Sequence, residues 1–123
     1  MKENILITIL FILLLVGCSS EPAVQSKTVE EVLISDGIYQ GQAPGRNGVV
    51  IVEVKIESQV ITDVRIVNHQ EDTRYVAEVE VAIVEIPERI VKSNSTQVDV
   101  VSKATVTSKA IMKAVEDALT NAK

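Results

Sequence analysis

The sequence predicts an α+β fold in which an antiparallel meander sheet has helices packed on one face. Segments 49–57 and 60–69 each alternate β-branched apolar residues with polar ones, which is typical of neighbouring strands with one buried face. Later segments place apolar residues three and four positions apart, which is typical of amphipathic helices. Because the sheet has only one apolar face, the helices are expected to cover that face.

The strands are predicted in chain order. Residues 36–43 are expected to form a first strand, with glycines where side chains would obstruct packing. Asn47-Gly48 lies in a cluster of turn-forming residues and predicts a hairpin loop before the second strand. The alternation directs one set of side chains inward, namely Val50, Val52, Val54 and Ile56 of the second strand and Val60, Thr62, Val64 and Ile66 of the third.

Two helices are expected after the sheet. Segment 73–94 contains no glycine and has Val76, Val79, Ile83, Ile86, Ile90 and Val91 at helical spacing. Pro87 is expected to break this helix or to start a second one, and a strand is an alternative for 79–84. Glu71 and Asp72 are expected to be a charge pair at the start of the helix. Segment 107–122 predicts another helix through its apolar stripe of Ile111, Ala114, Val115, Ala118 and Leu119.

The composition excludes several classes of function. The chain of 123 residues has a net charge of −5 and no cluster of Lys and Arg, which argues against a nucleic-acid partner. One Cys and one His exclude an internal disulfide and a conventional multi-His or multi-Cys metal site, so no bound metal is expected. Tyr39 and Tyr75 are the aromatic residues outside the first segment, so the core is expected to be aliphatic.

The first residues have the pattern of an export signal. Lys2 precedes an apolar run over 5–16, which is too short for a typical spanning helix and suits a signal peptide. The run ends in Leu15-Val16-Gly17-Cys18, which resembles the bacterial lipobox. The resemblance implies that 1–17 is a lipoprotein signal peptide and that Cys18 is lipidated, palmitate being one such acyl group. Segment 18–35 would then be a flexible tether on the extracytoplasmic side of a membrane, and 36–123 the folded domain.

Hydroxyl and carboxylate side chains are concentrated just before the last predicted helix. Asp99, Ser102, Thr105, Thr107 and Ser108 lie within ten residues of one another. Ser and Thr in this position can cap the free N–H groups at a helix start. The same N–H groups, together with the helix dipole, can bind an anion such as phosphate. The residues alone leave both interpretations open.

The motif Asp99-x-x-Ser102-Lys103-Ala104-Thr105 resembles Asp-x-x-Ser/Thr-Gly-Ala-Thr, the flavinylation motif of the FMN-binding domain family. That family includes the FMN-carrying subunits of Rnf and of sodium-pumping quinone oxidoreductases. The resemblance runs in order from about Asp36 to Leu119. It includes Asp36-Gly37-x-Tyr39-x-Gly41, Asn68-His69-Gln70-Glu71-x-Thr73, Ile86-Pro87-x-x-Ile90 and Thr107-Ser108.

The resemblance implies a covalent FMN cofactor on Thr105, joined through the hydroxyl as a phosphoester. A magnesium-dependent flavin transferase would attach it, with FAD as donor. Asp99, Ser102 and Ala104 would be read by the transferase or would shape the loop, and Thr107 and Ser108 complete the predicted cofactor-binding segment. Lys103 stands where the family has Gly, a residue type that suggests a positive φ or a close backbone approach. Lys103 and Lys109 are both candidates to neutralise the phosphate.

The expected function is that of a lipid-anchored electron carrier. FMN would accept electrons from a membrane donor and pass them to an external acceptor, and no catalytic residue of the chain itself is predicted. An adaptor or ligand-binding lipoprotein that keeps the fold without flavin is one alternative. A small flavin reductase with its own acceptor is another.

Overall fold

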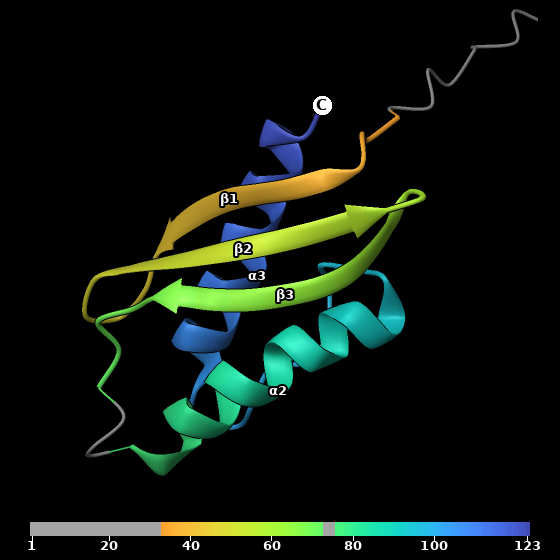
Figure 1. Cartoon of the computed structure of the whole chain (residues 1–123). Coiled ribbons are helices and arrows are strands. Elements are labelled where there is room, and N and C mark those ends of the chain that lie inside the picture. The colour runs from red at the N-terminus through yellow and green to blue at the C-terminus, as the bar shows by residue number, and fades with distance from the viewer. Residues whose placement is uncertain (1–32, 73–75) are drawn as a thin grey trace, which may run out of the picture. The chain divides into compact units, whose positions relative to one another are not determined.

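Three antiparallel strands form the sheet that alternation predicts. The computed structural model describes residues 33–72 and 76–123. The strands β1 (Gly37–Pro44), β2 (Val49–Glu57) and β3 (Val60–Asn68) lie in the order β1-β2-β3 (Figure 1). The predicted leader 1–17, the lipidation site Cys18, the tether up to residue 32, and the residues Thr73 and Tyr75 lie outside the described residues.

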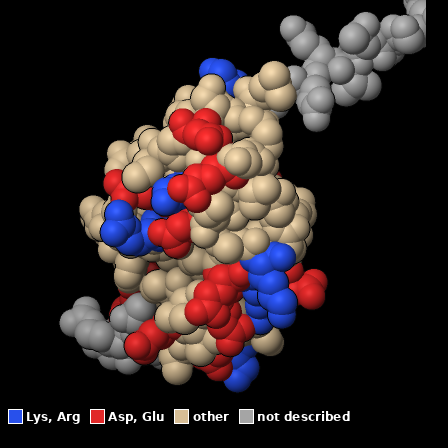
Figure 2. Space-filling model, turned by 45° about the vertical axis from the view of Figure 1, so that its right-hand side comes forward, with Lys and Arg blue, Asp and Glu red and all other residues tan. Residues whose placement is uncertain are grey.

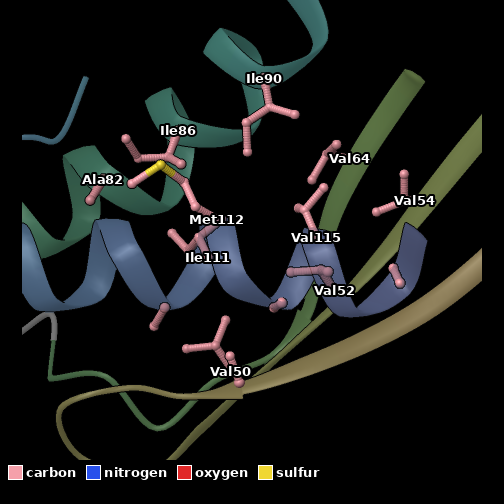
Figure 3. Packing of buried hydrophobic residues seen from close by; sticks show 14 of the residues in the cluster. Val50, Val52, Val54, Val64, Ala82, Ile86, Ile90, Ile111, Met112 and Val115 are labelled. Atoms are coloured by element: carbon pink, nitrogen blue, oxygen red, sulfur yellow. The ribbon is translucent and has the colours of Figure 1, made fainter. Parts of the chain in front are cut away.

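Two helices cover one face of the sheet, as predicted. Helix α3 (Thr105–Asn121) packs on β1 and β2, and helix α2 (Ala77–Ser93) packs on β3 and on α3 (Figure 1). The core between these layers is aliphatic, which was also predicted. Figure 3 shows helix residues of this cluster, such as Ile86, Ile90 and Val115, together with the strand residues Val52 and Val64. The predicted α+β class is therefore confirmed.

The third strand differs from its predicted alternation. Val64 is buried and Ile66 is half-buried as expected, whereas Val60 and Thr62 are exposed and Ile61 is buried in their place. The strand pairing gives the reason, because Ile61 lies opposite Ile56 and Asp63 lies opposite Lys55, which leaves Thr62 unpaired. This β-bulge reverses which residues face inward, so the prediction for the first half of the strand is wrong.

Helix α2 runs without a break through Pro87, so the predicted break is wrong, and the strand alternative for 79–84 is excluded. Proline removes one helical hydrogen bond, yet Pro87 is buried here together with Val79, Ala82, Ile86 and Ile90. Burial of this apolar face stabilises the helix enough to offset the missing bond. The helix ends at Asn94, which adopts the left-handed conformation (φ 48°) that is common at helix ends.

Glycine is required where α3 meets β1. A Cβ atom on Gly41 would overlap the carbonyl oxygen of Ala114 and the backbone nitrogen of Ala118. The helix and the strand therefore touch through their backbones, as the glycines of the first strand suggested. The contact fixes the rest of α3, including its first turn, relative to the sheet.

The outer surface carries charges of both signs. Acidic and basic side chains are interspersed on the face shown in Figure 2. One example lies on the open face of the sheet, where Arg65 Nη2 is 2.6 Å from Glu53 Oε2.

Across 33–72 and 76–123, no helix has both the length and the apolar run needed to span a bilayer.

Candidate functional site

Thr105 is the first residue of α3, and its side chain is exposed. Among the described residues, the structure gives its hydroxyl no hydrogen-bond partner. The residue before it, Ala104, occupies the N-cap position, and no side chain caps the helix. The first turn also contains no acidic residue, so the positive end of the helix dipole is not neutralised by the helix itself.

The loop before Thr105 is held from both helices. Arg89 of α2 donates through Nη1 to the backbone oxygen of Asp99 (2.7 Å). From α3, the Ser108 hydroxyl accepts from the Val101 N–H (3.1 Å) and donates to the Ala104 carbonyl (2.7 Å). These bonds fix residues 99–104, although the side chains of Asp99 and Ser102 are themselves exposed.

The predicted hydroxyl residues fall into two groups. Thr107 and Ser108 are 1% and 0% exposed, and both hydroxyls are engaged in hydrogen bonds inside the protein. Ser102 and Thr105 are exposed. The hydroxyl residues of the segment therefore have different roles. Ser108 holds the loop by internal hydrogen bonds, whereas Thr105 faces outward at the helix start.

Glu71 is a buried carboxylate, and the prediction that it forms a charge pair at a helix start is wrong. It is 6% exposed and lies in the loop before α2, not in a charge pair at the helix start, because α2 begins only at Ala77. One oxygen, Oε1, accepts from the backbone N–H groups of Arg46 (2.7 Å) and Asn47 (3.1 Å). The other oxygen accepts from the Thr107 hydroxyl. Glu71 thus joins the loop between β1 and β2 to the first turn of α3.

Lys103 adopts a left-handed conformation with φ 65°. The suggestion that the family's glycine marks a positive φ at this position is therefore confirmed. The Lys103 ammonium lies 3.4 Å from Glu78 Oε1, in the first turn of α2. A hydrogen bond from the backbone N–H of Glu78, and then the Lys103 ammonium, lower the pKa of the Glu78 carboxyl. Lys103 is thus directed to an acid of this chain.

Two shallow hollows adjoin the start of α3. One, of about 160 Å³, is lined by residues from three segments, namely Arg46, Val79, Lys103, Ala104, Thr105, Val106 and Thr107. The second, of about 200 Å³, is lined by Arg46, Asn47, Glu71, Asp72, Val76 and Val79. Arg46 and Val79 line both. The structure therefore brings together Lys103, Ala104, Thr105 and Thr107 of the predicted site, but not Asp99, Ser102 or Lys109.

Tyr39 and His69 lie apart from these hollows. The Tyr39 hydroxyl donates to the backbone oxygen of Ser35 (3.0 Å), and its ring packs against the core. The His69 side chain is half-buried, and its Nδ1 has no partner among the described residues. These contacts indicate a packing role for Tyr39.

Comparison with known proteins identifies the family. Residues 45–120, more than half of the chain, match the FMN-binding domain. The chain belongs to the FMN-binding domain family. The family expectation drawn from the motif is thereby confirmed, and the matched segment includes every residue of the two hollows.

Two known proteins are similar to this chain over most of its length. An uncharacterized protein of Treponema pallidum (strain Nichols) is 41% identical over 86 residues, which make up 70% of this chain and 23% of that protein. This chain therefore spans about a quarter of that relative. The crystal structure of the CPE2226 protein from Clostridium perfringens has a TM-score of 0.56 and 20% identity, covering 73% of this chain and 89% of that protein. At this identity the likeness shows the fold alone.

The site of this FMN-binding domain fits the cofactor's chemistry. An uncapped helix start without acidic residues suits the phosphate, and Arg46 adds a nearby cation. Val106, which is 54% exposed, lines the same hollow and offers apolar surface to a flat ring. Arg46 and Glu71 were not predicted as site residues, because Arg46 lies in a turn outside the segments that resemble the family, and Glu71, although it lies in one of them, was expected to be a charge at a helix start. Only the fold brings them to Thr105.

Proposed function

We propose that this protein is a membrane-anchored extracytoplasmic flavoprotein that carries FMN as a phosphoester on Thr105 and relays electrons. The observation that carries the proposal is the exposed Thr105 hydroxyl, which has no partner among the described residues and stands at an uncapped helix start. FMN, when bound, supplies the redox chemistry, and the residues around Thr105 hold its phosphate and exclude part of the solvent.

Attachment at Thr105 is a substitution at phosphorus. The Thr105 oxygen would form a bond to the FMN phosphorus of FAD, the bond from that phosphorus to the AMP half would break, and AMP would leave. The hydroxyl proton would pass to a base or to water, and the transferase would supply the magnesium ion. An exposed hydroxyl at a helix start is accessible to such an enzyme, whereas the buried hydroxyls of Thr107 and Ser108 are not.

A covalent bond suits the proposed location. A dissociated flavin would be lost outside the cytoplasm, while a tethered one stays at a permanently high local concentration. The chain's net charge of −5 also disfavours free FMN, whose phosphate monoester carries about −1.5 to −2 near neutral pH. Formation of the diester removes about one of these charges. The proposed role is that of a carrier between a membrane donor and an external acceptor.

The central test is co-expression with a flavin transferase. Intact mass should rise by one FMN moiety in the wild type and in Thr105→Ser, which keeps a hydroxyl, and should not rise in Thr105→Ala. Thr120→Ala, which removes an exposed threonine hydroxyl at the other end of the same helix, serves as the matched control and should be labelled like the wild type. No mass gain in any variant would refute the covalent proposal and favour a flavin-free adaptor.

The anchoring proposal has its own test. Cys18→Ser should move the protein from the membrane fraction to the soluble fraction of the expressing bacterium and abolish incorporation of a labelled fatty acid. Unchanged membrane association would refute lipidation at Cys18. For the relay, membrane vesicles with a respiratory donor should reduce the labelled wild type and leave Thr105→Ala without a reducible flavin.

A further inference from the structure

We propose that Arg46 binds the phosphate on Thr105 and that Glu71 is the positioning residue that holds Arg46 there. This inference rests on the proposed function, because it concerns how the same site recognises its ligand. It concerns a residue outside the sequence motif, about sixty positions upstream of Thr105.

Arg46 is placed at the junction of the two hollows. It lines the hollow that contains Thr105 and also the one that contains Glu71 and Asp72. Its side chain is exposed, and no ion pair with an acidic side chain is recorded for it among the described residues. Because Arg46 lines both hollows, its guanidinium can reach a phosphate on Thr105 and can screen that phosphate from Glu71 and Asp72.

The other nearby cations are committed elsewhere. Lys103 lines the Thr105 hollow, but its ammonium lies 3.4 Å from Glu78 Oε1. Arg89 pairs with Glu85 and donates to the Asp99 carbonyl. Lys109 is exposed and does not line either hollow. Arg46 is therefore the cation that faces the Thr105 hollow without a recorded acidic partner in the described residues.

Glu71 determines where Arg46 stands. Its carboxylate receives the Arg46 and Asn47 N–H groups on one oxygen and the Thr107 hydroxyl on the other. The loop wraps the carboxylate so closely that a Cβ atom on Gly45 would overlap Glu71 Oε1. Because Thr107 lies two residues after Thr105 on the same helix turn, one buried side chain fixes both the cation and the attachment residue.

The guanidinium suits this ligand. Its planar fork can donate two parallel hydrogen bonds to two phosphate oxygens, which a lysine ammonium cannot reproduce. The backbone N–H groups at the start of α3 offer further donors. A phosphate held in this way should stabilise the folded state by an amount that depends on salt, since the site is open to solvent.

The experiment compares the thermal midpoint of labelled and unlabelled protein, with labelling driven to completion by excess transferase. In the wild type, labelling should raise the midpoint at low ionic strength and raise it less at about 1 M salt, where the Debye length is about 3 Å. In Arg46→Gln the rise should fall by at least half and lose most of its salt dependence, the remainder being due to the start of α3. Arg46→Lys should be intermediate, and Lys109→Gln, a matched loss of one exposed cation, should behave as the wild type.

Glu71→Gln tests the positioning role. Its amide oxygen can still accept from the two N–H groups, so the fold should persist, while the contact to Thr107 is altered. We expect a reduced rise on labelling in this variant and no further reduction in Glu71→Gln combined with Arg46→Gln. Additive losses in the double variant would overturn the claim that Glu71 acts through Arg46.

The outcomes separate this inference from the proposed function. A wild type that gains no FMN mass refutes the proposed function itself. A labelled wild type whose midpoint rise and salt dependence match those of Arg46→Gln overturns the role of Arg46 alone. A folded Arg46→Gln that accepts no flavin also overturns it, because Arg46 would then serve the transferase rather than the bound phosphate.

Discussion

The two helices begin in opposite ways although each is 17 residues long and neither has a side-chain cap. The first turn of α2 contains Glu78 and Glu80, which neutralise the positive end of its dipole. The first turn of α3 contains no acid and begins with the exposed Thr105. The positive end of the α2 dipole is thus neutralised by residues of the helix itself, whereas the corresponding end of α3 is not, and the proposed function places the FMN phosphate there.

The two starts also differ in what holds them. Buried polar side chains anchor the beginning of α3, with Ser108 tethering the preceding loop and Thr107 bound to Glu71. At the beginning of α2 the buried side chain is apolar, namely Val79. The hydrogen bond there is a backbone one, from the Val79 N–H to the Val76 carbonyl (3.0 Å). The proposed phosphate site therefore lies at the helix start that buried side-chain hydrogen bonds hold in place.

The largest expected effect comes from breaking that anchor. Ser108→Ala leaves the buried Val101 N–H without its acceptor, which should destabilise the fold by about 1–3 kcal/mol. Urea unfolding of the unlabelled protein measures this. Ser102→Ala, an exposed serine in the same loop, is the control and should change the free energy of unfolding by less than about 0.5 kcal/mol. Equal effects of the two variants would contradict the anchoring role.

The next effect concerns Lys103, which precedes the start of α3 and has a positive φ. A non-glycine residue in the left-handed region costs about 1–2 kcal/mol, and an exposed ion pair offsets little of this. Lys103→Gly should therefore raise the free energy of unfolding by about 1 kcal/mol and should label as well as the wild type or better. Lys103→Ala removes the charge but keeps the strain, so it should not be stabilised. Reduced labelling of Lys103→Gly would mean that the lysine assists attachment.

A smaller effect is expected when an acidic residue is placed in the first turn of α3, where α2 already has two. Val106 is exposed in the first turn of α3, so Val106→Glu should stabilise the unlabelled protein by about 0.3–1 kcal/mol through the helix dipole. The same charge should slow labelling, because it occupies the electrostatic position of the phosphate. Val106→Gln, similar in shape and uncharged, is the control for both measurements. Labelling of Val106→Glu at the wild-type rate would contradict the idea that the start is kept open for an anion.

The smallest effect is a pH dependence at α2. The pKa of Glu78 lies below its ordinary value of 4.5, so the folded state favours the charged form. The resulting stabilisation is present above pH 4.5 and is lost as the pH falls through the folded-state pKa. The thermal midpoint of Glu78→Gln should be slightly below that of the wild type at neutral pH and equal to it in acid. A difference that persists in acid would have another cause.

The sheet and the helices could largely be predicted because the spacing of apolar residues in the sequence matches the faces that are buried in the structure. In β2 every inward residue was predicted, since its pairing with β1 is regular. In β3 the bulge at Thr62 shifts the pattern by one residue, and no local sequence feature marks it. The continuous helix through Pro87 was missed for a similar reason, because burial against the core overrides a local preference.

The site was only partly predictable. The motif located Thr105, but it did not separate Thr105 from Thr107 and Ser108, which are chemically alike and differ in burial. Arg46 and Glu71 were missed because their roles depend on contacts across 25 residues or more of sequence. The glycine of the family motif suggested a positive φ or a close backbone approach at Lys103, and the structure has the positive φ.

The Glu71 contacts also set an order of events during biogenesis. They connect Arg46 and Asn47, near the beginning of the domain, with Thr107, which lies close to its end. The proposed attachment site is therefore complete only once α3 has been synthesised and has docked on the sheet. If Arg46 binds the phosphate as proposed, only a domain that has made this connection would hold the flavin phosphate through Arg46, so an ordered cofactor would indicate a completed fold.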